Sequence, residues 1–208
     1  MIKYEILLVL ALLWPPALQA QQAPNFRDQV TGKAVETRAP GISVDVYPFL
    51  FLAEGPGGGG SLSGEWSHWQ VGLVGFTVVP PPFIKATFFR DAEGIDITRN
   101  DAVEVYLRYY LRPDRQGIYA GVIGGPEWFM MEETASGEQA TLVKSYAVPH
   151  LGLRWFPFQP WAFLDASIGY SINLSGTETN IVGETEYRAS AGGLLYFLQI
   201  GARYTFPD

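Results

Sequence analysis

Apolar and polar residues alternate along two long segments near the end of the chain. Between Trp161 and Leu174 every even-numbered residue is apolar, whereas the odd-numbered residues are mostly polar or small. Leu194–Phe206 repeats this pattern. A period of two predicts β-strands, because successive side chains of a strand point to opposite faces of its sheet. Both segments exceed the usual strand length of about 5–6 residues. The chain is therefore expected to form long, two-faced strands.

Six further segments complete a set of eight predicted strands. They are Ile42–Leu52, Trp66–Val78, Phe83–Arg90, Val103–Leu111, Ile118–Phe129 and Leu142–Phe156. Pro48 and Pro149 lie inside two of these segments. Because proline has no amide donor for the ladder, we expect bulges or local kinks at both positions.

The links between these strands alternate in length. The short links are Val79–Pro82, Arg112–Gly117 and Pro157–Pro160, and the long links are Ala53–Glu65, Asp91–Ala102, Met131–Thr141 and Ser175–Ser190. Strict alternation places every long link at one end of an antiparallel sheet, and an even number of strands places both termini at the other end. This layout predicts an all-β fold, an eight-stranded antiparallel up-and-down transmembrane β-barrel.

The polar faces of the strands indicate which side is the interior. They carry Asp45, His68, Gln70, Lys85, Glu104, Arg108, Arg154, Asp165, Gln199 and Arg203, together with the small residues Gly72, Gly121, Ser167, Gly169, Ser171 and Gly201. Aromatic residues gather at the predicted strand ends: Trp66, Trp69, Trp128 and Phe129 near the long links, and Phe76, Phe83, Trp155, Phe156, Trp161, Tyr204 and Phe206 near the short ones. Two aromatic girdles around an aliphatic band favour a lipid-facing exterior and a polar lumen. The alternative is a soluble β-sandwich or a lipocalin-like barrel.

The first twenty residues have the composition of a secretory signal peptide. Lys3 precedes the apolar core Ile6–Trp14, and Pro15 and Pro16 follow it before a polar segment. We therefore expect a signal peptide over residues 1–20, an exposed N-terminal arm over 21–40 and the barrel over 41–208. Because no later segment offers about 18 uninterrupted apolar residues, no spanning helix is expected.

The last predicted strand carries a motif of its own. Gln199, Gly201, Tyr204 and Phe206 are spaced as polar, glycine, aromatic and aromatic, although Pro207 and Asp208 follow the final aromatic residue. This spacing resembles the terminal strand of small eight-stranded bacterial outer-membrane barrels such as the OmpA transmembrane region, OmpX and OmpW, over about residues 41–206. The resemblance implies a location in the outer membrane of a Gram-negative-type cell envelope. It also implies that the barrel-insertion machinery recognises this strand.

The expected lumen has two alternative uses. Eight strands enclose a space just wide enough for side chains to fill, whereas a wide diffusion porin needs about 16–18 strands. Asp45, Glu104 and Asp165 could pair with Lys85, Arg108, Arg154 and Arg203 as an ion-paired plug, and His68 completes the predicted polar network. The same residues could instead line a narrow path for small or hydrophobic solutes, which the resemblance to OmpW favours.

Charge and composition restrict the partners. The net charge is −7, so the chain does not attract the negatively charged phosphate backbone, and no nucleic-acid partner is expected. The four long links together carry 12 Asp and Glu against Arg99 and Arg188. These acids are expected either as solvated charges of exposed loops or as ligands of divalent cations that bridge them to anionic outer-leaflet lipid. Membrane lipid is the predicted partner. With 0 Cys and no twelve-residue calcium loop around Asp91–Asp96, no metal site and no cofactor are expected.

A catalytic role would require a Ser–His pair with an orienting carboxylate, as a lipid-modifying enzyme of this architecture would use. Ser67 and His68 are adjacent, so strand geometry points them to opposite faces. Ser145 and His150 also have opposite parity, although a bulge at Pro149 would restore their phase. We therefore expect no catalytic residues, and predict a monomeric barrel with a structural or surface-interaction role.

Overall fold

The computed structural model describes residues 39–52, 55, 57–81, 85, 88–90, 92–157, 161–176 and 179–207. The predicted signal peptide and residues 21–38 of the predicted arm lie outside this set. No helix among the described residues is long and apolar enough to cross a membrane.

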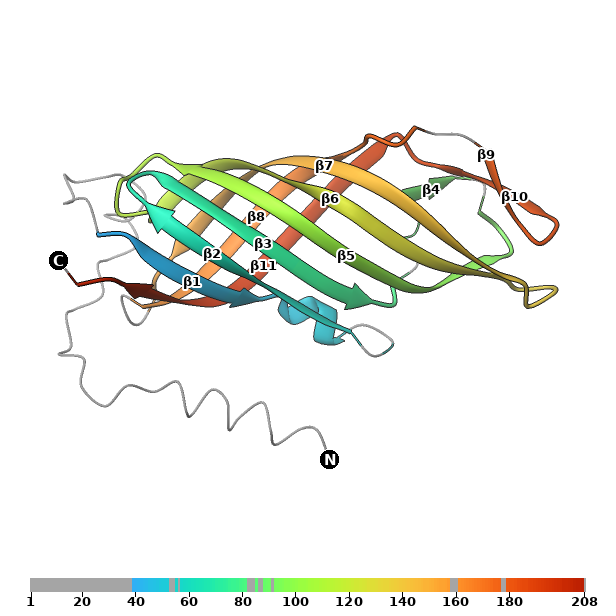
Figure 1. The fold of residues 1–208 in the computed structure, drawn as a ribbon, viewed down its shortest axis with the longest axis horizontal. Helices are drawn as coiled ribbons and strands as arrows, with labels where there is room; N and C mark the ends of the chain where they lie inside the picture. Colours follow the sequence, from blue (N-terminus) through green and yellow to red (C-terminus); the bar gives the residue numbers. More distant parts are fainter. Residues whose placement is uncertain are drawn as a thin grey trace, which may run out of the picture.

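Eight strands form a closed antiparallel barrel, as the sequence predicted (Figure 1). They are β1 (Gly41–Val46), β2 (Gly58–Trp66), β3 (Trp69–Val78), β5 (Ile95–Tyr110), β6 (Gly117–Glu133), β7 (Gln139–Trp155), β8 (Ala162–Asn173) and β11 (Gly192–Thr205). Each strand pairs with the next barrel strand along the chain. The first and last strands close the ring, with Val44 opposite Ala202.

The barrel is longer on one side than on the other. Strands β5, β6 and β7 have 16, 17 and 17 residues, whereas β1 has 6 and β2 has 9. The long strands therefore extend beyond the rest of the rim (Figure 1). A small sheet of β4 (Phe89–Arg90), β10 (Thr185–Ala189) and β9 (Thr179–Val182), in that order, lies at this extended end.

The side chains divide between the two faces of the barrel. In β1, Ser43 and Asp45 are buried while Ile42, Val44 and Val46 are exposed. The same alternation continues around the ring, where the exposed side chains include Leu62, Leu73, Val103, Val105, Leu151, Ile168, Ile172 and Ile200. An apolar exterior around a polar interior is the reverse of a soluble barrel. It matches a surface that faces lipid.

The predicted third strand was wrong. Phe83–Arg90 contributes no barrel strand among its described residues, of which Phe89 and Arg90 form β4. The barrel instead uses β2, inside the segment predicted as the long link Ala53–Glu65. Glycine and serine occupy most positions of β2, so its alternation of Ser61, Ser63 and Glu65 with exposed Leu62 and Trp66 has little hydrophobic contrast.

This correction also moves the first turn. The link between β2 and β3 is Ser67–His68, and Ser67 has a φ of 45°, as a two-residue hairpin requires. Val79–Pro82 therefore begins a long link rather than forming a short one. The other short links remain, between β5 and β6 and between β7 and β8. The link between β6 and β7 was predicted to be long, but both strands continue and leave a tight hairpin of residues 134–138.

The predicted bulges at Pro48 and Pro149 do not form, although the β7–β8 ladder leaves out Val148 and Pro149 without a change of register. β1 ends at Val46, and Pro48 begins the 3₁₀ helix η2 (Pro48–Leu52), so Ile42–Leu52 is a strand only in its first half. The β6–β7 register runs without a shift through Pro149, which lies opposite Val122. A register shift occurs instead in β5, between Ile97 and Arg99.

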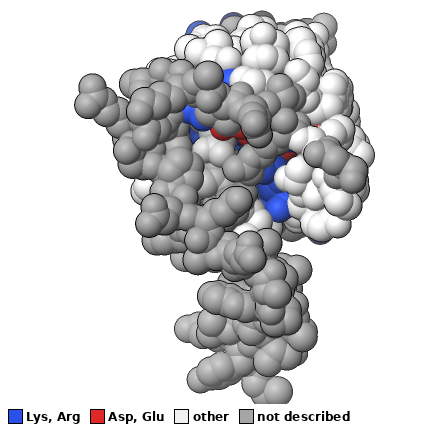
Figure 2. Space-filling view, turned by 90° about the vertical axis from the view of Figure 1, so that its left-hand side faces the viewer, with Lys and Arg blue, Asp and Glu red and all other residues white. Residues whose placement is uncertain are grey.

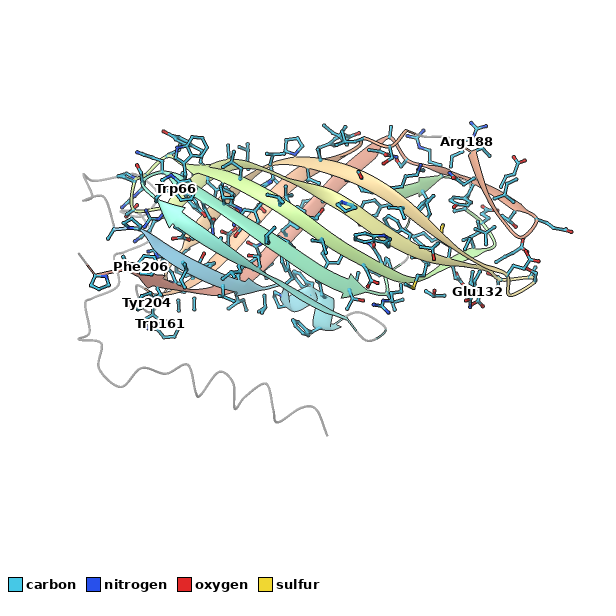
Figure 3. All side chains as sticks on the ribbon, in the orientation of Figure 1. Trp66, Glu132, Trp161, Arg188, Tyr204 and Phe206 are labelled. Atoms are coloured by element: carbon cyan, nitrogen blue, oxygen red, sulfur yellow. The ribbon has the colours of Figure 1, made fainter. Side chains whose placement is uncertain are left out.

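Trp161, Tyr204 and Phe206 lie at the end that carries the short turns and the C-terminus, which we call the turn end, as the sequence predicted (Figure 3). Trp66 lies at the same end and pairs with Trp69, so these two residues were predicted at the wrong end. Exposed aromatic residues near the other end, the loop end, include Phe49, Phe51, Tyr170 and Tyr196. Phe129 and Phe156 are buried and belong to neither girdle.

Candidate functional site

The polar residues of the barrel interior form the candidate site. Six of the eight predicted network residues are buried and face the lumen: Asp45, Glu104, Arg108, Arg154, Asp165 and Arg203. The other two predictions were wrong. His68 lies in the β2–β3 turn, where its ring stacks on Tyr109 at 5.2 Å, and Lys85 lies in the β3–β5 link, where its Nζ donates to the Ile95 carbonyl. Lys85 was misplaced with the predicted third strand, and His68 was misplaced because Trp66–Val78 was predicted as one strand across the β2–β3 turn.

Arg154 is the centre of an ion-pair network near the turn end. Its Nη1 lies 2.6 Å from Glu65 Oε1, and its Nε lies 3.2 Å from Asp165 Oδ2. Arg108 also pairs with Asp165, at 3.2 Å. All four side chains are at most 2% exposed. Since an isolated charge is costly to bury, this arrangement is stable only because each charge has a partner of opposite sign.

Glu65 connects this network to the turns. Its Oε2 lies 3.2 Å from Arg115 Nε and 3.6 Å from Arg203 Nη1. Arg115 belongs to the β5–β6 turn and also donates to the Ala39 carbonyl at 2.9 Å. Viewed from the turn end, Lys and Arg side chains, together with some Asp and Glu, are visible in the gaps beside uncharged residues (Figure 2). The network therefore extends from mid-lumen to the mouth of the barrel.

Neutral side chains make further hydrogen bonds with these charged groups. Gln70 accepts from Arg154 at 2.9 Å and from the Tyr110 hydroxyl at 2.8 Å, and its amide donates to Ser43 and Ser63. Gln199 accepts from Arg108 at 3.0 Å. The Tyr119 hydroxyl donates to Asp165 at 2.5 Å. A buried polar network stabilises a unique arrangement when its members are satisfied in this way.

The lumen glycines make room for aromatic rings. Gly72 lies directly opposite Tyr106, Gly152 opposite Tyr119 and Gly201 opposite Phe163. A Cβ at any of these glycines would overlap the opposing ring. The rings in turn carry the arginines: the Arg108 guanidinium lies 4.5 Å from the Tyr106 ring centre and 4.8 Å from that of Tyr119, and the Arg154 guanidinium lies 4.1 Å from that of Phe163.

Sequence reasoning missed two central residues of this network. Glu65 was assigned to an external loop, and Arg115 to a short link. The signal for Glu65 was present, because Ser61, Ser63 and Glu65 occupy alternate positions before Trp66. Arg115 carried no comparable signal, since it reaches the lumen from a turn, where its φ is 56°.

An apolar cap closes the loop end of the lumen. Buried Phe88, Phe89, Ile95, Ile97, Phe129, Met131, Tyr146, Val182 and Tyr187 form one cluster. The rings of Phe88 and Phe89 lie 5.5 and 4.9 Å from that of Phe129. The cap joins the small sheet to the extended strands, so these described parts of the loops pack onto the barrel.

Glu133 fixes the small sheet to the β6–β7 hairpin, beyond the apolar band. It was predicted among the solvated loop acids, but it is buried. Its carboxylate accepts hydrogen bonds from Ser136 Oγ and Thr185 Oγ1, each at 2.5 Å, and from the Glu184 amide at 3.1 Å. These hydrogen bonds, led by that from Ser136, hold the pKa of Glu133 below its usual range.

The Ser–His pair and the terminal-strand motif considered from the sequence do not form a second site. Ser145 lies on the outer face of β7 while His150 is buried in the lumen with its Nδ1 3.0 Å from the Val148 carbonyl, so they do not meet. Of the terminal motif, Gln199 is in the lumen network, whereas Tyr204 and Phe206 are exposed with ring centres 5.7 Å apart. Within the described residues, no group of three or more His, Cys, Asp and Glu side chains could hold a metal ion.

A closed eight-stranded barrel with an apolar exterior and an ion-paired interior defines the class: the chain has the fold of a membrane-spanning β-barrel. No family model matches the chain, and no curated protein matches it. Among solved structures it is similar to a major outer membrane protein from Thermus thermophilus, with a TM-score of 0.51 and 11% identity over 80% of this chain and all 100% of that one. It is also similar to the N-terminal β-barrel domain of Pseudomonas aeruginosa OprF, with a TM-score of 0.47 and 15% identity over 80% and 99%. The fold is that of a small outer-membrane β-barrel, as the sequence predicted.

Proposed function

We propose that this protein is a structural barrel whose lumen is filled by its own side chains and whose loop end provides a surface for interactions outside the cell. The observation that carries this proposal is the ion-pair network around Arg154, which occupies the turn half of the lumen. The apolar cap at the loop end supports it independently. A solute entering from either end meets packed side chains.

Planar-bilayer conductance tests the filled lumen. The wild-type protein is expected to give no discrete openings, and Arg99→Ala, which changes an exposed arginine outside the lumen, serves as the control. Discrete openings in the wild type, with a size that changes in Arg108→Ala or Asp165→Ala but not in Arg99→Ala, would contradict the proposal. That result would support a narrow channel instead.

The narrow channel is the second candidate, and one observation favours it. Asp45 Oδ1, Arg108 Nε, His150 Nε2 and Ser167 Oγ are buried in the lumen and have no hydrogen-bond partner among the described residues. Buried polar atoms usually bind ordered water when protein partners are lacking. Waters bound to these atoms would form a chain beside the ion-pair network, and small solutes would follow this chain through the lumen.

We further propose no catalytic role for this barrel, since Ser145 and His150 face opposite sides of β7. The proposed partners are the surrounding lipid and the barrel-insertion machinery. Exposed acids at the loop end, such as Glu93 and Glu138, could bind anionic outer-leaflet lipid through divalent cations. Exposed Tyr204 and Phe206 are the proposed contacts with the insertion machinery. Fewer folded barrels in membranes from cells expressing Phe206→Ala, with unchanged expression, is the expected result.

A further inference from the structure

Two buried glutamates in the loop half of the lumen lack the ion pairs that Glu65 and Asp165 make. Glu104 is 6% exposed and Glu127 is 4% exposed. No Lys or Arg among the described residues lies within 4.0 Å of either carboxylate, whereas Glu65 and Asp165 each pair with at least two arginines. The nearest candidate partner, Lys144, lies opposite Glu127 in the β6–β7 register, but the contact that its ammonium makes is with the Gly176 carbonyl at 3.4 Å.

The register brings the two glutamates and one carboxamide together. Asn100, Ala102 and Glu104 are successive lumen-facing residues of β5, and Glu127 of β6 lies directly opposite Ala102. Glu127 is therefore the diagonal neighbour of both Asn100 and Glu104, a separation that long side chains span. Because the side chain of Ala102 is short, it leaves space that the side chains of Asn100, Glu104 and Glu127 can occupy.

Asn100 supplies an independent indication that something is bound here. Its side chain is 3% exposed, and its Nδ2 donates to Glu127 Oε2 at 2.8 Å. Its Oδ1 is buried and accepts no hydrogen bond from a described residue. Because both atoms belong to one planar amide, this unpartnered oxygen lies beside the same carboxylate. An acceptor left in this state is costly unless a donor or a cation occupies the position.

We propose that Asn100, Glu104 and Glu127 form a binding site for a hard divalent cation inside the loop half of the lumen. Carboxylate and carboxamide oxygens are the ligands that Ca²⁺ and Mg²⁺ prefer, and water supplies the remaining coordination positions. The cation offsets the charge of two neighbouring carboxylates and satisfies the amide oxygen. This site is separate from the ion-pair network and from the exposed acids of the loops.

Terbium luminescence tests the site, because Tb³⁺ replaces Ca²⁺ and is excited by energy transfer from nearby aromatic rings. Tyr146 of β7 lies opposite Gly125 in the β6–β7 register, two residues from Glu127, and Phe129 is also close. The full chain, folded in detergent, is expected to show saturable Tb³⁺ emission that Ca²⁺ displaces. Glu104→Gln and Glu127→Gln should each weaken binding by about tenfold or more, as ligand loss does at oxygen sites.

The matched control is Asp114→Asn, which removes an acid of the β5–β6 turn at the opposite end of the barrel and should leave the emission unchanged. Asn100→Asp is expected to retain binding and Asn100→Ala to weaken it, which separates a ligand from a residue needed only for folding. A heat-dependent shift on a detergent gel establishes that each variant is folded. Emission that Ca²⁺ does not displace, or emission lost in Asp114→Asn but kept in Glu127→Gln, would overturn the proposal.

Discussion

Replacing Arg154 by methionine is the most direct perturbation of the lumen network. Methionine retains most of the length and apolar volume of the side chain but removes its charge. The ion pairs to Glu65 at 2.6 Å and Asp165 at 3.2 Å are lost, together with the hydrogen bond to Gln70. The two carboxylates remain buried, because the surrounding strands hold them in the lumen.

The expected cost follows from the partners that remain. Breaking a buried ion pair by removing one partner costs about 3–5 kcal/mol, since it leaves a buried charge uncompensated. Glu65 keeps Arg115 at 3.2 Å, and Asp165 keeps Arg108 at 3.2 Å, so neither is left alone. We therefore expect the lower end of the range, a decrease of about 3 kcal/mol in the free energy of unfolding.

Urea unfolding in lipid vesicles, followed by tryptophan fluorescence, measures this change. Arg99→Met is the control, because Arg99 pairs with Asp101 at 2.8 Å but is 53% exposed. An exposed pair contributes less than about 1 kcal/mol. If Arg154→Met is as stable as Arg99→Met, the network does not stabilise the barrel as argued. In a double-mutant cycle, Arg154→Met with Glu65→Gln should cost less than the sum of the two single changes.

Two further predictions concern packing and pH. Gly152→Ala forces a methyl group against the Tyr119 ring and should lower the free energy of unfolding by about 1–3 kcal/mol, whereas Gly75→Ala, with no atom near its Cβ position, should change it little; equal effects in urea unfolding would contradict the packing argument. For Glu133, folding lowers the pKa from its ordinary value of 4.5, so its carboxylate stabilises the loop contacts fully above pH 4.5 and loses this contribution as the pH falls through the lower folded value. A ¹³C NMR titration of the Glu133 carboxyl should give a midpoint below 4.5 that moves upward in Thr185→Val, and an unmoved midpoint would exclude that hydrogen bond.

The fold was predictable because each strand of a lipid-facing barrel alternates apolar and polar residues, and this pattern is visible locally in the sequence. The contrast between faces is strong in β8 and β11, where aliphatic residues alternate with polar or small ones. It fails in β2, where glycine and serine dominate, so that strand was mistaken for a loop. The second error, the predicted strand Phe83–Arg90, arose because this segment is rich in aromatic residues, as strands are.

The candidate site was predictable as a set of buried charges but not as a set of pairs. Parity alone places Arg108, Arg154 and Asp165 on the lumen side. The pairing of each arginine with a carboxylate depends on how strands far apart in the chain, such as β2 and β7, face each other across the lumen. No local sequence pattern contains this information. Arg115 and Glu133 were missed for a related reason, since turns and hairpins do not follow strand parity.

The composition of the lumen follows from one repeated arrangement across neighbouring strands. A glycine on one strand admits a ring from the next, the ring supports a guanidinium, and the guanidinium pairs with a carboxylate; Gly201, Phe163, Arg154 and Glu65 form one such series. Gly72, Tyr106, Arg108 and Asp165 form another. Each member needs the one before it, so no single side chain can swing aside without exposing a buried charge or an empty space. A lumen packed in this way resists opening in small steps, which is the physical reason to favour a plug over a channel.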